Sequence, residues 1–186
     1  MQKELYKILT SKDASKQVLD NLDLVLYLIP ELIDTIGFDH KHPHHHLDVW
    51  EHTLMALSLS PNDLDIRIAL LLHDIGKPHS FIEGEVRHYN HHAEVSADMA
   101  EKILDRLGFD DDYIAMICKM IKFHDTPLTE QDIVQNYGFC EKLFKVQTCD
   151  ALSHNPQENT KRLAYLEKMK NIFNEYIIKV CKYEHI

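Results

Sequence analysis

The chain has 186 residues, of which 45% are hydrophobic and 27% charged, and its formal net charge is −10. This composition is typical of one folded globular domain and excludes a disordered chain. The acidic balance argues against broad attraction to nucleic acid or anionic membranes. The scarcity of Gly (5) and Pro (6) favours an all-α fold.

The cysteines and the N-terminal residues indicate the cellular compartment. The four cysteines form no C-x-x-C pair and are interpreted as ordinary thiols: Cys118, Cys140, Cys149 and Cys181. The first seven residues have no apolar signal core, and the longest apolar runs are too short to span a bilayer. We therefore expect a cytoplasmic protein.

Apolar spacing in the first third of the chain predicts helices over 3–9, 16–29 and 30–37, then a polar loop over 38–47. Asp48 is typical of an N-cap and predicts a helix over 49–58. His52 lies on the apolar face of that helix, at helical spacing from Met55, Ala56 and Leu59. We expect the His52 side chain to point into the core.

The next helix carries an imidazole and a carboxylate at its inner end. Ile66, Ala69 and Leu70 recur at helical spacing, His73 continues this apolar face and Asp74 follows, before Gly76 and Pro78 stop the helix. Such polar groups are costly to bury without partners. Two interpretations stay open at this point: a metal site, or a buried histidine hydrogen-bonded to its neighbour.

The second half of the chain brings further polar residues onto apolar faces. Residues 81–91 are predicted to be irregular, with a small hairpin around 83–85, and later helices are predicted over 92–107, 111–123, 129–137, from 138 to Asp150, and 157–182. His92, His124 and Asp150 each fall on the apolar face of one helix. We expect all three to point inward.

Histidine is the unusual residue of this composition, with 14 copies. The run His42-Pro43-His44-His45-His46 is internal and interrupted by proline, so we interpret it as a polar loop that binds metal adventitiously.

Taken together, the inward-facing groups indicate a metal site. They are four histidines and two carboxylates: His52, His73, Asp74, His92, His124 and Asp150. Packing alone does not explain so many polar groups in apolar surroundings. Nitrogen and oxygen donors without thiolate disfavour a structural zinc site and suit Fe, Mn, Co, Ni or Mg. One or two divalent ions are expected, and two ions bridged by one carboxylate would use all six donors.

These residues resemble the H…HD…H…H…D pattern of the HD-domain superfamily of metal-dependent phosphohydrolases. The stretches Asp48–Leu54, His73–Pro78 and His92–Ala97 are most similar to the HD domain carried by bacterial CCA-adding tRNA nucleotidyltransferases. The likeness covers roughly residues 4–155. It implies an all-α helical bundle forming a single domain over 1–186, with an HD core at about 45–155, N-terminal helices over 1–38 and a C-terminal helix over 156–186.

Two departures from the family qualify the resemblance. The nucleotidyltransferase head motifs are absent from this sequence, so polymerising chemistry is not carried over. His91 stands where the family often has Gly, which leaves His91 and His92 as rival ligands. We favour His92, because Glu94 and Ser96-Ala97 then keep the family's spacing.

The resemblance also implies roles. One metal would be held by His52, His73, Asp74 and Asp150, with Asp74 bridging to a second held by His92 and His124. Asp74 and Lys77 are the catalytic candidates. Lys77 would reach a substrate phosphate, or it is a solvated lysine that complements the helix dipole. Arg87, His88 and Asp125 are candidates for substrate contact or leaving-group protonation.

The function implied is hydrolysis of a phosphomonoester or phosphodiester of a nucleotide-like substrate, 2′,3′-cyclic phosphates among them, through a metal-activated water. The acidic charge favours a small nucleotide over long nucleic acid, with a tRNA or RNA end as another candidate. The alternatives are a di-iron HD-fold oxygenase and a non-catalytic metal- or nucleotide-binding module. The sequence does not give the metal, the substrate or whether the chain is a monomer or a homodimer.

Overall fold

A computed structural model describes the backbone of residues 1–183 and the side chains of residues 1–179. Within that part of the chain the secondary structure is helical, with isolated β-bridges in place of strands. The all-α prediction is therefore confirmed. No helix in the described part is long and apolar enough to cross a membrane.

The N-terminal segment forms short helices: α1 (Gln2–Leu9), α2 (Ala14–Asp20), α3 (Leu22–Leu28) and the 3-10 helix η1 (Pro30–Thr35). The prediction of one continuous helix over 16–29 was wrong, because the helix is interrupted at Asn21. The Asn21 side-chain amide donates to the carbonyl oxygen of Gln17 over 2.9 Å. Asparagine binds nearby backbone groups in this way and so ends helices that apolar periodicity alone would continue.

The central helices are α4 (Val49–Ser58) and α5 (Leu64–Leu72), which pack against each other. Asp48 and Glu51 form a reciprocal capping box at the start of α4. His52 and Ala56 are buried as expected, but Met55 and Leu59 are exposed. The buried face of α4 is therefore rotated by part of a helical turn from the predicted face. Every residue of α5 from Ile66 to Leu72 is buried, which makes α5 the core helix.

His73 and Asp74, the His-Asp pair of the HD pattern, follow α5 rather than lying within it. The helix ends at Leu72, and His73 to Gly76 form a turn that leads into the 3-10 helix η2 (Lys77–His79). The loop after η2 contains an antiparallel bridge between Ile82 and His88, in agreement with the expected small hairpin. This turn brings the chain to the start of α6.

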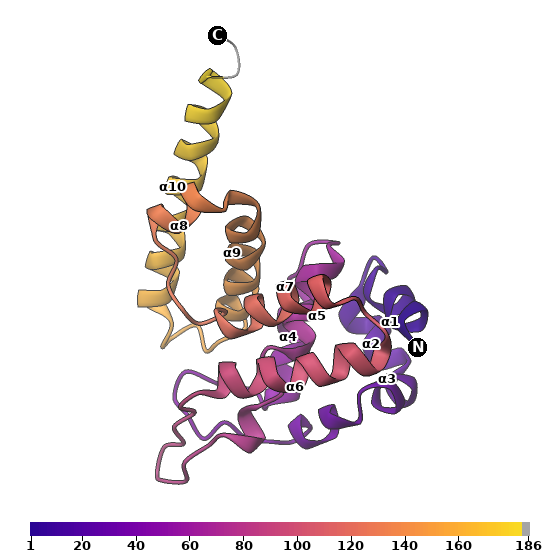
Figure 1. The fold of residues 1–186 in the computed structure, drawn as a ribbon. Helices are drawn as coiled ribbons and strands as arrows, with labels where there is room; N and C mark the ends of the chain where they lie inside the picture. Colours follow the sequence, from indigo (N-terminus) through magenta and orange to yellow (C-terminus); the bar gives the residue numbers. More distant parts are fainter. Residues whose placement is uncertain (184–186) are drawn as a thin grey trace.

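Helices α6 (His92–Leu107) and α7 (Asp111–Lys122) lie side by side, joined at Gly108 (Figure 1). Gly108 has a φ of 88°, the left-handed conformation common at helix ends. Helices α8 (Glu130–Gln135), α9 (Tyr137–Leu152) and α10 (Thr160–Tyr183) follow. Figure 1 shows α10 extending away from the N-terminal helices, with its first turns beside α9.

Helix α10 packs on α8 and α9, and its residues Met169 and Phe173 belong to the hydrophobic core. It starts three residues later than expected, because the Asn155 side chain accepts a hydrogen bond from the Gln157 backbone and holds a turn there. Cys118, Cys140 and Cys149 are free thiols, and the side chain of Cys181 lies outside the described residues.

Candidate metal centre

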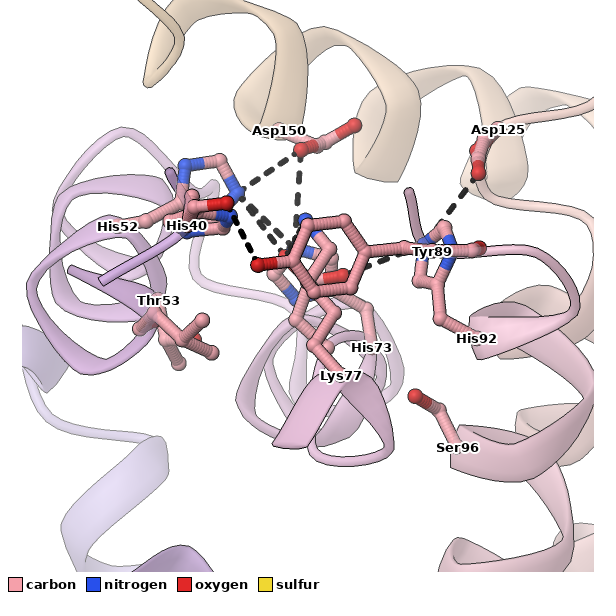
Figure 2. A network of polar contacts seen from close by, with 12 residues as sticks. His40, His52, Thr53, His73, Lys77, Tyr89, His92, Ser96, Asp125 and Asp150 are labelled. Carbon is pink, nitrogen blue, oxygen red and sulfur yellow. Dashed lines mark hydrogen bonds and ion pairs between the residues drawn. The ribbon is translucent and has the colours of Figure 1, made fainter. Parts of the chain in front are cut away.

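Six buried side chains converge from five parts of the fold. They come from α4, the turn after α5, the start of α6, the turn after α7 and the last turns of α9: His52, His73, Asp74, His92, His124 and Asp150. In Figure 2, His52 and His73 lie below Asp150, while His92 lies further along, near Asp125. The structure thus brings together every residue that the sequence predicted as a ligand.

Main-chain carbonyls set the tautomer of three of these histidines. In each case Nδ1 donates to the carbonyl oxygen three residues earlier: His73 to Leu70 over 2.7 Å, His92 to Tyr89 over 2.9 Å and His124 to Ile121 over 2.7 Å. A carbonyl oxygen only accepts, so the proton sits on Nδ1. Each Nε2 is left with a free lone pair, as in most metal-binding histidines.

His52 reaches the same tautomer through a serine. The Ser153 hydroxyl donates to the carbonyl oxygen of Asp150 over 2.6 Å, so its oxygen accepts from Nδ1 of His52 over 2.9 Å. The lone pair of His52 is therefore also on Nε2. Sequence reasoning missed Ser153, because nothing in its local sequence signals a contact with α4.

Asp74 lies between two pairs of imidazoles. Its Oδ2 is 3.5 Å from Nε2 of His52 and 3.3 Å from Nε2 of His73. Its Oδ1 is 3.5 Å from Nε2 of His92 and 3.7 Å from Nε2 of His124. Both oxygens are buried without a partner in hydrogen-bond geometry. A carboxylate placed in this way is suited to bridge two cations.

Asp150 completes the first of these groups. Its Oδ1 lies 3.0 Å from Nε2 of His52 and 3.6 Å from Nε2 of His73. Its Oδ2 accepts from the Arg162 guanidinium over 2.7 Å, and the same guanidinium donates to the carbonyl oxygen of His124 over 3.2 Å. Arg162 at the start of α10 therefore orients Asp150, a role that the sequence did not predict.

The Nε2 atoms of the histidines approach each other closely in two pairs. Nε2 of His52 is 3.2 Å from Nε2 of His73, and Nε2 of His92 is 3.3 Å from Nε2 of His124. Two lone pairs at this separation repel unless a proton or a metal cation lies between them. The four imidazoles and the two-sided carboxylate thus fit two metal ions, and the donor set contains no thiolate. Two of the groups able to hold an ion are His52–His73–Asp74 and Asp74–His92–His124.

The protonation of the first group agrees with this need for positive charge. Burial lowers the pKa of His52 to about 4, against the opposing effect of Asp150. Burial also acts on His73, but the Asp74 charge and the hydrogen bond to Asp150 outweigh it and raise the pKa of His73 to about 10. The charges of His73 and Lys77 overcome burial and hold the pKa of Asp74 well below its usual range. A metal ion would replace the proton on His73.

The structure decides between the buried and the solvent-exposed interpretation of Lys77. Its side chain is buried, and Nζ lies 2.7 Å from Oδ2 of Asp74. The ammonium is also 5.6 Å from the centre of the Tyr89 ring. The interpretation of Lys77 as a solvated lysine at the helix end was therefore wrong, because the turn after α5 directs its side chain toward the Asp74 carboxylate.

The other predicted residues line a cavity of about 630 Å³ that opens onto the same group. Arg87, His88 and Asp125 all contribute to its wall, together with Lys161 and Arg162. Arg87 is held by Glu83 and by the carbonyl oxygen of Asp39, and its guanidinium stacks on two phenylalanine rings. Although burial opposes it, the His124 and His92 imidazoles lower the pKa of Asp125, so this carboxyl group stays ionised and accepts hydrogen bonds.

The structure separates His91 from His92. His92 is buried with Nε2 toward Asp74, whereas the side chain of His91 is 82% exposed. His91 has a φ of 64°, a left-handed conformation that favours glycine. Its backbone turns the chain into α6 while its imidazole stays outside the site.

Comparisons with known proteins agree with this geometry. The HD domain family matches residues 44–181. The chain is 34% identical over 139 residues to an A-adding tRNA nucleotidyltransferase of Deinococcus radiodurans, covering 69% of this chain and 32% of the relative. A CC-adding tRNA nucleotidyltransferase of Thermus thermophilus is 33% identical over 141 residues, covering 70% and 32%. The chain thus spans about a third of the length of these relatives, and it belongs to the HD domain family.

Proposed function

We propose that the chain is a metal-dependent phosphohydrolase acting on a phosphomonoester or phosphodiester of a nucleotide-like substrate. The observation that supports this most directly is Asp74, with one oxygen toward His52 and His73 and the other toward His92 and His124. Divalent ions bound there supply Lewis acidity and a water of lowered pKa for attack on phosphorus. The ions we expect are Fe, Mn, Ni or Co, with Mg as a further candidate.

The cavity supplies the groups that a phosphate requires. Lys77 lies at its base beside Asp74, and Arg87, Lys161 and Arg162 add positive charge to its wall. A phosphate oxyanion is stabilised by such cations in a site partly shielded from water. Lys77 would bind the substrate as a point charge when Asp74 is engaged by metal. Tyr89 and His88 also line the cavity, and aromatic rings are suited to contact a nucleobase.

Asp125 and Arg162 have different tasks in this proposal. Asp125 is a carboxylate at the cavity, 3.3 Å from Nε2 of His92, so it would accept a hydrogen bond from water or from a substrate hydroxyl. Arg162 holds one oxygen of Asp150 and keeps the other aimed at His52 and His73. We infer that Arg162 is a positioning residue.

The relatives suggest which substrates to try. They are named as tRNA nucleotidyltransferases, so we include an RNA 3′ end and 2′,3′-cyclic nucleotides among the phosphate esters. The test is product release by metal-loaded protein from bis-p-nitrophenyl phosphate, 2′,3′-cAMP, common nucleotides and a short RNA with a 3′ phosphate. We expect release that falls about 100-fold or more in Asp74→Asn, because the bridging carboxylate is lost.

His91→Gln is the matched control, because His91 neighbours the ligand His92 but is exposed. We expect its rate to equal that of the natural sequence. Absence of release from protein shown by elemental analysis to hold its metals would reject the hydrolase for these substrates. Oxygen-dependent turnover with iron would then favour the oxygenase, and tight nucleotide binding without turnover would favour the binding module.

A further inference from the structure

A second group of imidazoles adjoins the metal centre on the side of His52. It consists of His40, His45 and His154, which we call the outer histidines. The rings of His40 and His45 stack with centroids 3.6 Å apart, and those of His45 and His154 are 4.5 Å apart. The ring of His45 is also 5.1 Å from that of His52. None of the outer histidines belongs to the ligand set described above.

The fold holds these residues together from distant parts of the chain. The loop that carries His45 is tied to the connection between α9 and α10, because the Asn155 backbone donates to the carbonyl oxygen of His44 over 2.8 Å. The Asn155 side-chain amide also donates to the carbonyl oxygen of Pro43 over 3.2 Å. The segment interpreted from the sequence as a polar loop is therefore docked, with His45 beside His154.

His154 has a partner, because its Nε2 lies 3.2 Å from Oδ1 of Asp150, but packing does not explain His40 and His45. His40 is only 1% exposed, and neither of its ring nitrogens has a hydrogen-bond partner. Nδ1 of His45 is buried and also lacks one. Leaving buried polar groups unpaired in this way is unfavourable. His45 lines the cavity, and an unpaired imidazole nitrogen there points to a ligand that accepts its lone pair.

One ring nitrogen from each of His45, His52 and His154 lies within 4.8 Å of the other two. Three imidazoles that reach one ion at about 2.0–2.1 Å each lie about 4 Å or less apart, so an ion here would draw these rings slightly closer together. His45 and His154 also line the cavity, which gives an ion a route from solvent.

We propose that His45, His52 and His154 form an outer metal position that shares His52 with the inner one. The Nδ1 proton of His52 is held by Ser153, so His52 has a single lone pair, on Nε2, to offer. An ion in the outer position therefore uses the lone pair that His52 would otherwise offer to an ion beside His73 and Asp74. His52 can thus bind an ion in only one of the two positions at a time.

The donor set determines which ions fit. Three imidazoles favour Ni²⁺, Cu²⁺, Zn²⁺ and Co²⁺ over Mg²⁺ and Mn²⁺. The neighbouring carboxylate is Asp150, whose Oδ1 lies 3.2 Å from Nε2 of His154 and already contacts His52. If the proposed hydrolase is correct, excess Ni²⁺ or Zn²⁺ would inhibit it by drawing His52 outward. That consequence rests on the proposed function, whereas the outer position itself does not.

The test is Ni²⁺ binding by calorimetry to the 186-residue chain carrying Asp74→Asn, which weakens the inner position and frees His52. We expect Ni²⁺ affinity to fall about tenfold or more when His45→Gln and His154→Gln are added, as for the loss of metal ligands generally. The matched control adds His42→Gln and His44→Gln, which lie on the same loop and line the same cavity. Equal affinity in the two variants would overturn the outer position.

A second measurement keeps the test decisive if the outer variants fold poorly. Crystals of Asp74→Asn soaked in Ni²⁺ would show an anomalous peak between His45, His52 and His154. A peak confined to His92 and His124 would refute the proposal. Neither measurement uses a substrate, so failure of the outer position and failure of the hydrolase are distinguishable.

Discussion

The backbone N–H of Gly76 donates to the hydroxyl of Ser96 over 2.9 Å. This bond joins the turn that carries His73 and Asp74 to the helix that carries His92. A Cβ on Gly76 would lie 2.6 Å from the Ser96 backbone nitrogen and 3.0 Å from the carbonyl oxygen of His92. The close approach of the two segments therefore requires glycine at this position.

We expect Gly76→Ala to destabilise the protein by about 1–3 kcal/mol, as overpacking generally does, because the Cβ meets backbone atoms that cannot move independently. Metal affinity should fall as well, since α6 is pushed away from the turn. Urea unfolding and calorimetric metal titration would measure both effects. Gly138→Ala is the control: nothing lies within 4 Å of its Cβ, and it should be neutral or stabilising. Equal stability of the two variants would contradict the packing argument.

His91→Gly should stabilise the protein by up to about 1 kcal/mol, because glycine adopts the left-handed conformation of residue 91 without strain. Metal binding should be unchanged, since the imidazole of His91 is exposed. His92→Gln, one residue further, should lower metal affinity instead. Thermal unfolding and metal titration of this pair test which histidine is the ligand, and a loss of metal in His91→Gly would reverse our choice.

Metal stoichiometry should distinguish the two inner positions. We expect His124→Gln to lose the ion beside His92 and to keep the ion beside His52, because only Oδ1 of Asp74 faces His124. Asp74→Asn should weaken both positions, since its two oxygens face different imidazole pairs. Elemental analysis after gel filtration would measure the ratio of ion to protein. Equal losses in the two variants would argue against a bridging Asp74.

The pair Glu31–Arg106 gives a pH-dependent contribution outside the site. Arg106 donates to both carboxylate oxygens over 2.7 and 2.9 Å, which joins η1 to α6. The hydrogen bond from Arg106 lowers the pKa of Glu31 from its usual value of 4.5. Because the folded-state pKa is depressed, the stabilisation is present above pH 4.5 and is lost as the pH falls through the folded-state value.

We therefore expect Glu31→Gln to cost less than about 1 kcal/mol at pH 7, since the pair is partly exposed to solvent. The difference from the natural sequence should shrink as the pH drops below 4. Urea unfolding at several pH values would follow it, with Lys16→Gln, in a more exposed pair, as the comparison. A difference that grows on acidification would refute the assignment.

The sequence predicted the candidate ligands better than the residues that orient them. His92, His124 and Asp150 could be found because each continues an apolar face at helical spacing, a signal contained within one helix. Ser153 and Arg162 could not, since their importance depends on contacts with His52 and Asp150 across turns whose geometry no local pattern encodes. The break at Asn21 was missed for a related reason: a single side-chain hydrogen bond outweighed the apolar periodicity around it. The division into one domain and the ligand roles remain predictions.

The separation of His52 and Asp150 along the chain has a mechanical consequence. The two residues are 98 positions apart in sequence, yet an ion between them would tie them as firmly as a covalent bridge. Closing a loop of about 100 residues removes roughly 5 kcal/mol of unfolded-chain entropy in the case of a disulfide. The ion would thus act as a reversible cross-link in a chain whose described cysteines are all free thiols. The temperature at which the protein unfolds would then report the concentration of free metal around it.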